Sequence, residues 1–290
     1  MILKMSSKAF LSLIHFIFLN TVFISISSQQ LGQKNLFDET RLKNLKLKNR
    51  IFRGAVGDQT FINGKISEEG FKLYDYLSKN GVGTIFTGYT IVSDYYQRDN
   101  GRTFRLDKDE YIPEFKKLVD LVHKNGANIL TQLVHIGMNT MSKSEFIYSP
   151  SSLPIKNQNR NSKSMTKEDI LRIENNYAEA ALRAKKAGFD GVEIHGAHFY
   201  LISEFLSPLY NKRTDEYGGN NENRARFLLE IIKKVRDKVG KDYLVGLKIN
   251  SEDADENGIT EEGFFKACQL AEDVGVDYIQ ISGMKWYKEK

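Results

Sequence analysis

The stretch "AKKAGFDGVEIH", residues 184–195, decides the fold class because it joins a helix to a buried strand through a glycine. Helix formers precede Gly188, where a helix can end in the left-handed conformation that glycine adopts without a Cβ penalty. Four other segments repeat this order of helix formers, glycine and a short strand rich in Val and Ile. The glycines at the five junctions are Gly81, Gly126, Gly188, Gly240 and Gly275.

The strands that follow these glycines are predicted to be parallel. They read as continuous apolar runs, as expected where both faces of a sheet are covered, and repeated helix-to-strand units build parallel sheets with helical crossovers. An earlier strand is predicted at about residues 50–56, within "LKLKNRIFRGAVGD". The sequence therefore predicts six strands, with a helix after each of the first five. Helix starts are predicted at Thr166, at Asn220 or Asn221, and at Thr260.

The position of the long polar segments distinguishes a barrel from a doubly wound sheet. These segments follow the strands on their C-terminal side, where (β/α)8 barrels build their active sites. A dinucleotide-binding sheet would carry a Gly-x-Gly-x-x-Gly turn after the first strand, and none follows residues 50–56. We therefore predict an α/β fold, a (β/α)8 TIM barrel that is incomplete. About six of the eight βα units are expected before the chain stops at Lys290, without the last two strands.

The N-terminus has a different character from the rest of the chain. Lys4 and Lys8 precede an apolar run over residues 10–26, and small residues follow it. Three interpretations stay open for residues 1–30: a secretory signal peptide, a membrane anchor that contacts the bilayer through residues 10–26, or a mis-assigned start. The first two place the protein in the secretory pathway or at a membrane, and the third in the cytoplasm. The barrel domain is assigned to residues 31–290.

Composition excludes several classes of partner and cofactor. The chain has 290 residues and a formal net charge of +5, but its lysines are scattered, so no nucleic-acid partner is expected. Cys268 is the only cysteine, which excludes an intrachain disulfide and any cysteine-ligated zinc or iron–sulfur cluster within this chain.

The strands at the two edges of an unclosed barrel would invite pairing with another chain, so a homo-oligomer is one expectation.

The fourth strand ends in "HGAHFY", which brings His195, His198 and Tyr200 close together in sequence. The two histidines are consistent with a metal site, with a polar pair for a carbonyl or oxyanion, or with unrelated surface groups. Zinc would need a third ligand such as His135 or Glu193, and the pattern His-Glu-x-x-His is absent, so no metal is predicted. The carbonyl or oxyanion site is the favoured interpretation, with Tyr200 as a proton donor beside the pair.

Other strand ends carry features that suit a flat, polar ring. Gln132 has an amide that can both donate and accept hydrogen bonds. Lys248 lies between apolar residues and needs a partner, which Asp253 or Glu252 could supply as a structural ion pair. Gly54 and Ala55 end the first strand with small side chains, which allows a ligand to approach the backbone.

These residues resemble a known family. The segments "LKLKNRIFRGAVGD", "QLVHIG", "HGAHFYLISEFLSPLYNKRTDEYGGNNENRARF" and "LKINSED" are similar to the old yellow enzyme family of NAD(P)H:flavin oxidoreductases, in particular the bacterial ene-reductase and 2,4-dienoyl-CoA-reductase-like branch. The resemblance covers about residues 35–290. It implies a (β/α)8 barrel that holds one FMN across its mouth, with NAD(P)H as reductant and a small enone or enoyl compound as substrate.

The resemblance also implies roles for individual residues. Backbone at four positions is expected to line the flavin: Gly54, Ala55, Val56 and Tyr89. Gln132 is expected to hydrogen-bond the pyrimidine edge, and Lys248 to lie near flavin N1. His195 and His198 resemble the pair that holds the substrate carbonyl oxygen, and Tyr200 resembles the proton donor.

The implied activity is reduction of the C=C bond of α,β-unsaturated carbonyl compounds. The alternative is an inactive remnant of such an enzyme, or a binding module without flavin. The segment "NKRTDEYGG", with Arg213, Asp215 and Tyr217, is typical of the family, and we expect it to fix a loop through a local salt bridge and a glycine turn.

Overall fold

The computed structural model describes residues 35–93, 102–139, 147–155 and 159–283. The segment 1–30, with its apolar run at 10–26, lies outside the described residues. Within the described ranges, no helix combines the length and the apolarity needed to cross a bilayer.

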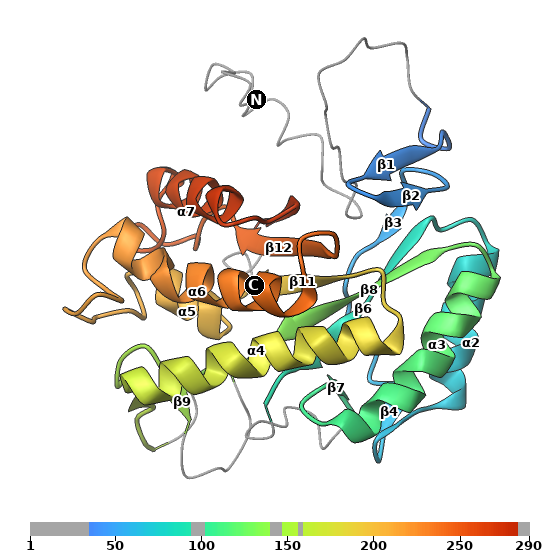
Figure 1. Cartoon of the computed structure of the whole chain (residues 1–290). Coiled ribbons are helices and arrows are strands. Elements are labelled where there is room, and N and C mark those ends of the chain that lie inside the picture. The colour runs from blue at the N-terminus through green and yellow to red at the C-terminus, as the bar shows by residue number, and fades with distance from the viewer. Residues whose placement is uncertain (1–34, 94–101, 140–146, 156–158, 284–290) are drawn as a thin grey trace.

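A parallel sheet forms the centre of the molecule (Figure 1). Its strands are β3 (Phe52–Arg53), β6 (Thr84–Ile91), β8 (Asn128–Val134), β11 (Gly191–Gly196), β12 (Leu244–Asn250) and β13 (Tyr278–Ser282), hydrogen-bonded in this order. Strand β7 (Phe104–Arg105) also pairs with the end of β6. The six predicted strands are confirmed, although the first is shorter than the predicted 50–56.

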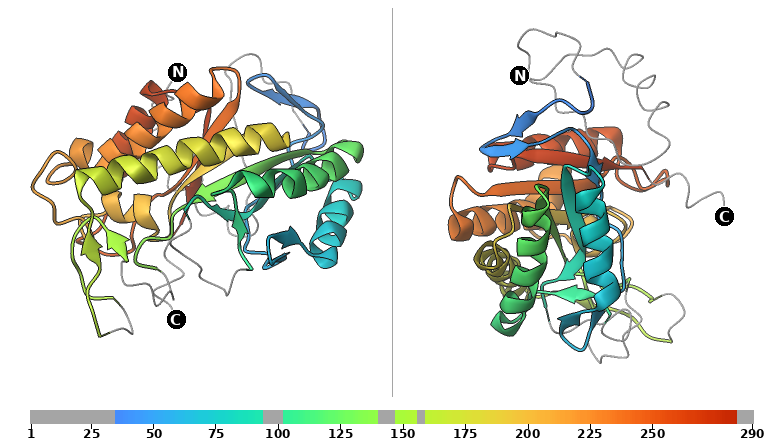
Figure 2. Two further views of the ribbon diagram at one scale, coloured as in Figure 1. Left: turned by 60° about the horizontal axis from the view of Figure 1, so that its bottom comes forward. Right: turned by 90° about the vertical axis from the view of Figure 1, so that its right-hand side faces the viewer.

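Helices cover one face of this sheet. They are α2 (Glu68–Lys79), α3 (Ile112–Lys124), α4 (Lys167–Ala187), α5 (Leu201–Leu206), α6 (Asn221–Val239) and α7 (Glu261–Asp273), with a 3₁₀ helix η1 at Asp109–Tyr111. Figure 2 shows the long helices lying side by side, and those next to each other in the chain are in contact, α3 with α4, α4 with α6, and α6 with α7. In a (β/α)8 barrel the strands and helices follow one another around the sheet in chain order, whereas a doubly wound sheet reverses direction. The order seen here is that of a barrel, curled but incomplete.

Local sequence signals explain where these helices begin and end. Thr166 caps α4 by accepting a hydrogen bond from the Asp169 amide, and the Asp169 side chain accepts from the Thr166 amide in return, a capping box. At the starts of α6 and α7, the side chains of Asn220 and Thr260 each accept one backbone hydrogen bond, without a reciprocal contact. All five junction glycines have positive φ, between 72° and 100°. The predicted helix starts and glycine junctions are therefore confirmed.

Short antiparallel and parallel pairs complete the described chain. The hairpin of β1 (Thr40–Leu42) and β2 (Leu45–Leu47) precedes the sheet, and β4 (Phe61–Ile62) pairs with β5 (Lys65–Ile66). Strand β9 (Tyr148–Ser149) pairs with β10 (Lys163–Ser164) before α4.

Apolar side chains pack on both sides of the sheet, and a cavity lies beside one of these clusters. The main core lies between sheet and helices, and it includes the partly buried Cys268 on α7. A second cluster of Phe86, Leu130 and Leu244 lies at the N-terminal ends of the strands, under the β1–β2 hairpin. A cavity of about 220 Å³ lies there, between the hairpin and the sheet. It is at the opposite end of the strands from His195, so it belongs to the base of the barrel and not to its mouth.

Candidate functional site

His195, His198 and Tyr200 meet at the C-terminal end of the sheet. The ring centroids of His195 and His198 are 4.9 Å apart, and those of His195 and Tyr200 are 4.8 Å apart, both edge to face. His195 and Tyr200 are 2% and 6% exposed, and the Tyr200 ring also lies 5.9 Å from that of Tyr89 on β6. The structure thus brings together the three side chains that the sequence predicted as the reactive group.

The loop after β11 is held in a strained conformation. His198 and Phe199 have φ values of +61° and +55°, a region that residues with a Cβ rarely adopt. The His198 amide donates to Asn250 Oδ1 at 3.1 Å, and His198 Nε2 lies 2.8 Å from Ser282 Oγ. Two neighbouring strands therefore fix the His198 ring. Asn250 and Ser282 were not predicted, because only strand pairing brings them next to His198.

Burial keeps both imidazoles neutral at physiological pH. It lowers the pKa of His195 well below its usual value, helped by His198 and Lys248, and lowers the pKa of His198 to about 4, helped by Lys248. His195 Nδ1 accepts a hydrogen bond from the Ala197 amide at 3.2 Å. The neutral ring therefore carries its proton on Nε2, where it can donate to an oxygen.

The loop after β3 lies against β6, where the resemblance places flavin-lining backbone. A Cβ on Gly88 would come within 2.8 Å of the Val56 carbonyl oxygen, so this close approach requires glycine. The Asp58 carboxylate fastens the loop, because it pairs with Arg53 and accepts from Tyr74 Oη at 2.5 Å. Gly54 and Ala55 are half-buried in this loop, and Val56 is 60% exposed.

A group of polar side chains forms the floor beneath His195. Gln132 Nε2 donates to Glu193 Oε1 at 2.6 Å, and Glu193 is fully buried. With its amide nitrogen toward Glu193, Gln280 also donates to both carboxylate oxygens, at 2.8 and 3.1 Å. Burial raises the pKa of Glu193 to about 7, against the opposing effects of Lys248, Gln132 and Tyr278. Glu193 was considered in the sequence only as a metal ligand.

Lys248 is 9% exposed and projects from β12 beside His195 on β11. Its Nζ makes no hydrogen bond or ion pair within the described chain. The suggested ion pair with Asp253 or Glu252 is wrong, because neither carboxylate pairs with Lys248. Asp253 accepts from Ser207 Oγ at 2.5 Å and from the Ile259 amide at 2.8 Å instead. Burial lowers the pKa of Lys248 and Glu193 opposes the shift. A buried ammonium without a direct partner is an anchor for an anionic or strongly polar ligand.

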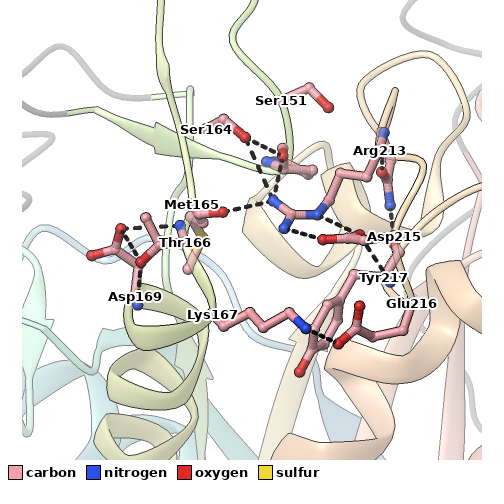
Figure 3. A network of polar contacts seen from close by, with 12 residues as sticks. Ser151, Ser164, Met165, Thr166, Lys167, Asp169, Arg213, Asp215, Glu216 and Tyr217 are labelled. Atoms are coloured by element: carbon pink, nitrogen blue, oxygen red, sulfur yellow. Dashed lines mark hydrogen bonds and ion pairs between the residues drawn. The ribbon is translucent and has the colours of Figure 1, made fainter.

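The segment "NKRTDEYGG" has the structural role that was predicted for it (Figure 3). The Arg213 guanidinium binds Asp215 through two hydrogen bonds, at 3.0 and 2.6 Å. Its third nitrogen donates to the carbonyl oxygens of Pro150 and Met165, at 2.9 and 2.7 Å. Arg213 therefore holds the loop before α6 against the segment that leads into α4.

A metal centre finds no support in the part of the chain that the structure describes. No three His, Cys, Asp or Glu side chains gather there in a way that could hold a metal ion. His135, one of the two suggested third ligands, is fully buried, and burial lowers its pKa to about 3. The other, Glu193, is engaged by Gln132.

A comparison with protein families identifies the family of the chain. The model of the NADH:flavin oxidoreductase / NADH oxidase family matches residues 35–288. The chain belongs to this family. An old yellow enzyme homologue from Zymomonas mobilis has a similar structure, with a TM-score of 0.76 and 25% identity over 86% of this chain and 74% of its own. The family therefore has the old yellow enzyme type of barrel, with FMN as cofactor and NAD(P)H as reductant.

The chain spans only part of the length of two curated relatives. The chain is 36% identical to an NADH oxidase of Thermoanaerobacter brockii over 86% of its own length, but spans only 39% of that relative. It is also 36% identical to an NADPH dehydrogenase of Geobacillus sp. (strain WCH70), over 85% of its own length and 72% of the relative's.

The residues at the mouth fit the isoalloxazine ring of FMN. Lys248 offers a cation without a direct partner, and Gln132 Oε1 accepts no hydrogen bond from the described residues. The close contact of Gly88 with the Val56 backbone places the first loop directly against β6. These groups would hold the polar end of the ring, and the loop after β3 would line its edge.

Proposed function

We propose that the chain carries the catalytic barrel of an FMN-dependent NAD(P)H oxidoreductase that reduces the C=C bond of α,β-unsaturated carbonyl compounds. The observation that carries the proposal is the edge-to-face group of two histidines and a tyrosine beside a buried lysine. Gln132 and Lys248 would hold the polar end of FMN, and the bound cofactor would supply the hydride chemistry that links NAD(P)H to the β-carbon of the substrate.

His195 and His198 have the chemistry to bind a carbonyl oxygen. Their neutral rings donate N–H groups without the desolvation cost of a buried imidazolium, and His195 presents its Nε2 proton because its Nδ1 is occupied by the Ala197 amide. Fixed donors contribute most where negative charge develops, which in this reaction is the carbonyl oxygen.

Tyr200 is the proposed acid that protonates the α-carbon. Its ring packs between those of His195 and Tyr89, so the side chain is held in one orientation at the mouth. A positioned acid of this type contributes about 10²–10⁴-fold to the rate. Lys248 would favour the reduced, anionic form of the bound ring by its charge.

Anaerobic stopped-flow absorbance tests this function. The chain, loaded with FMN and reduced with one equivalent of NADPH, is mixed with 2-cyclohexenone. Reappearance of the oxidised flavin spectrum together with cyclohexanone formation supports ene reduction. Reoxidation by O₂ but not by the enone would limit the activity to NAD(P)H oxidation.

A further inference from the structure

The Glu193 carboxylate is the hydrogen-bond acceptor that two side-chain amides of the polar floor share. Strand pairing sets Gln132 of β8 directly beside Glu193 of β11, and Gln280 of β13 reaches the same carboxylate from two strands away. Glu193 has no exposed surface, so solvent cannot replace these contacts. A buried carboxylate that binds two amides imposes one orientation on each of them, because an ionised carboxylate only accepts hydrogen bonds.

The orientation of Gln132 has a direct chemical consequence. Its Nε2 is directed at Glu193 at 2.6 Å, so its Oε1 lies on the other side of the same planar amide. This oxygen receives no hydrogen bond from the residues that the structure describes. Gln132 therefore presents an acceptor to whatever occupies the mouth, and the matching ligand group is an N–H donor. If the amide were reversed, Gln132 would present a donor and select for a carbonyl oxygen instead.

Glu193 also balances the charge of the floor. It is the carboxylate that opposes the lowering of the Lys248 pKa, and the other titratable groups near the floor are His195, His198 and Tyr278. The two imidazoles are neutral and the pKa of the Tyr278 phenol is raised well above its usual value. Above about pH 7, where Glu193 is ionised, Glu193 and Lys248 are thus the two groups of opposite charge in the floor.

We propose that Glu193 is a positioning residue that fixes the Gln132 amide oxygen as an acceptor for the ring N–H of the flavin. This inference rests on the proposed function, because it takes FMN as the ligand of the mouth. Through Gln132, Glu193 thereby selects for a heterocycle that has an N–H group facing Gln132 Oε1. Glu193 itself does not contact the substrate.

Binding of FMN and of 3-methyl-FMN, in which a methyl group replaces the N3 proton, tests the proposal. Fluorescence titration of the wild-type chain should show FMN binding about tenfold more tightly, because a buried acceptor loses its partner in the analogue. In Glu193→Gln the neighbouring amide can present either a donor or an acceptor, so Gln132 can reverse. We expect the preference for FMN to fall to about threefold or less.

Glu174→Gln is the matched control, since Glu174 is another buried carboxyl, on α4, outside the site. It should keep the wild-type preference. An unchanged preference in Glu193→Gln would overturn the proposal. If the wild-type chain binds neither flavin, the proposed function fails. The positioning role of Glu193 is then tested by a measurement on the protein without flavin.

Nuclear magnetic resonance of the side-chain amides tests the contact between Gln132 and Glu193 without any flavin. The same measurement can be used if Glu193→Gln does not fold. The Gln132 signal is assigned by its loss in Gln132→Met, and exposed Gln59 is the reference. Slowed exchange and a downfield shift of one Gln132 amide proton relative to Gln59 would support the contact with Glu193. Gln132 signals that match those of Gln59 would overturn it.

Discussion

The His195 ring meets the Tyr200 ring edge to face at a centroid distance of 4.8 Å, and both side chains are almost fully buried. A hydrogen-bond donor and an acid are therefore held side by side although five positions separate them in the chain. The turn that brings them together contains the two residues with positive φ, His198 and Phe199. Backbone strain at this turn is balanced by the hydrogen bonds of His198 to β12 and β13.

Replacing Tyr200 by Phe should separate the two half-reactions. Flavin reduction by NADPH is expected to stay within about twofold of wild type, whereas reoxidation by the enone should slow by about 10²-fold or more because the acid is lost. Stopped-flow absorbance measures both steps. Equal slowing of the two would mean that Tyr200 does not act as the proton donor.

The double substitution of His195 and His198 by Ala should abolish enone reduction and leave FMN bound. The two rings are expected to contact the substrate oxygen, while the floor and the first loop hold the flavin. Equilibrium dialysis gives the FMN affinity, and product formation gives the activity. Loss of FMN from the double variant would show that the pair belongs to the cofactor site instead.

Asp58→Asn should weaken FMN binding by about tenfold, since it breaks the contacts that hold the loop after β3 and a mobile loop must be ordered on binding. The Asp58 carboxylate joins Arg53 to Tyr74, which lies on α2. Tyr74→Phe removes one of these contacts and should show a smaller effect. Affinity equal to wild type in Asp58→Asn would show that the loop is ordered without this network.

Much of the fold follows from local signals in the sequence. The five junction glycines and the caps at Thr166 and Thr260 act within a few residues, so a pattern in the sequence is enough to reveal them. Strand β3 is shorter than predicted because its pairing with β6 covers only Phe52 and Arg53. Local propensity does not determine where a neighbouring strand ends.

The site was only partly predictable for the same physical reason. The three reactive side chains are close in sequence, and their residue types indicate hydrogen-bond donors and an acid: His195, His198 and Tyr200. The partners of His198 and Glu193 lie as many as 87 positions away in the chain (193 to 280), and they meet only through the pairing of β8, β11, β12 and β13. The sequence showed that Lys248 needs a partner and suggested Asp253 or Glu252. Neither residue forms an ion pair with Lys248, and Asp253 accepts a hydrogen bond from Ser207 instead.

A carboxyl pair between α4 and α6 should make stability fall as the pH rises from about 4.5 to about 8. Burial, together with Glu230, raises the pKa of Glu174 to about 8. Between pH 4.5 and about 8 the folded state holds a proton that the unfolded chain has released, so this contribution to stability is lost progressively over that interval and is absent above about pH 8. Glu174→Gln should unfold at a higher temperature than wild type at pH 9, by about 2–4 °C for each 1 kcal/mol, and show no such advantage at pH 5.

Calorimetry at the two pH values checks this expectation. Glu179→Gln is the control, because Glu179 also lies on α4 but is half exposed and paired with Lys238. An equal difference between Glu174→Gln and wild type at pH 5 and pH 9 would contradict the shared-proton account.

Arg213→Lys should destabilise the protein by about 2–3 kcal/mol although it keeps the charge, because an ammonium cannot reproduce the two-pronged contact with Asp215 and the contacts with two carbonyl oxygens. Urea unfolding followed by circular dichroism measures the change. Lys212→Arg, at the neighbouring exposed position, is the control and should change stability by less than about 0.5 kcal/mol. A loss below about 0.5 kcal/mol in Arg213→Lys would show that the network does not stabilise the fold.

The visible absorption spectrum of the purified full chain, incubated with FMN and then desalted, tests the central claim most directly. A flavin oxidoreductase barrel should retain a protein-bound flavin spectrum that bleaches when NADH or NADPH is added under argon, and the Lys248→Met variant should retain less. Colourless protein after desalting, or bound flavin that neither nicotinamide bleaches, would contradict the claim and favour a binding module without flavin chemistry.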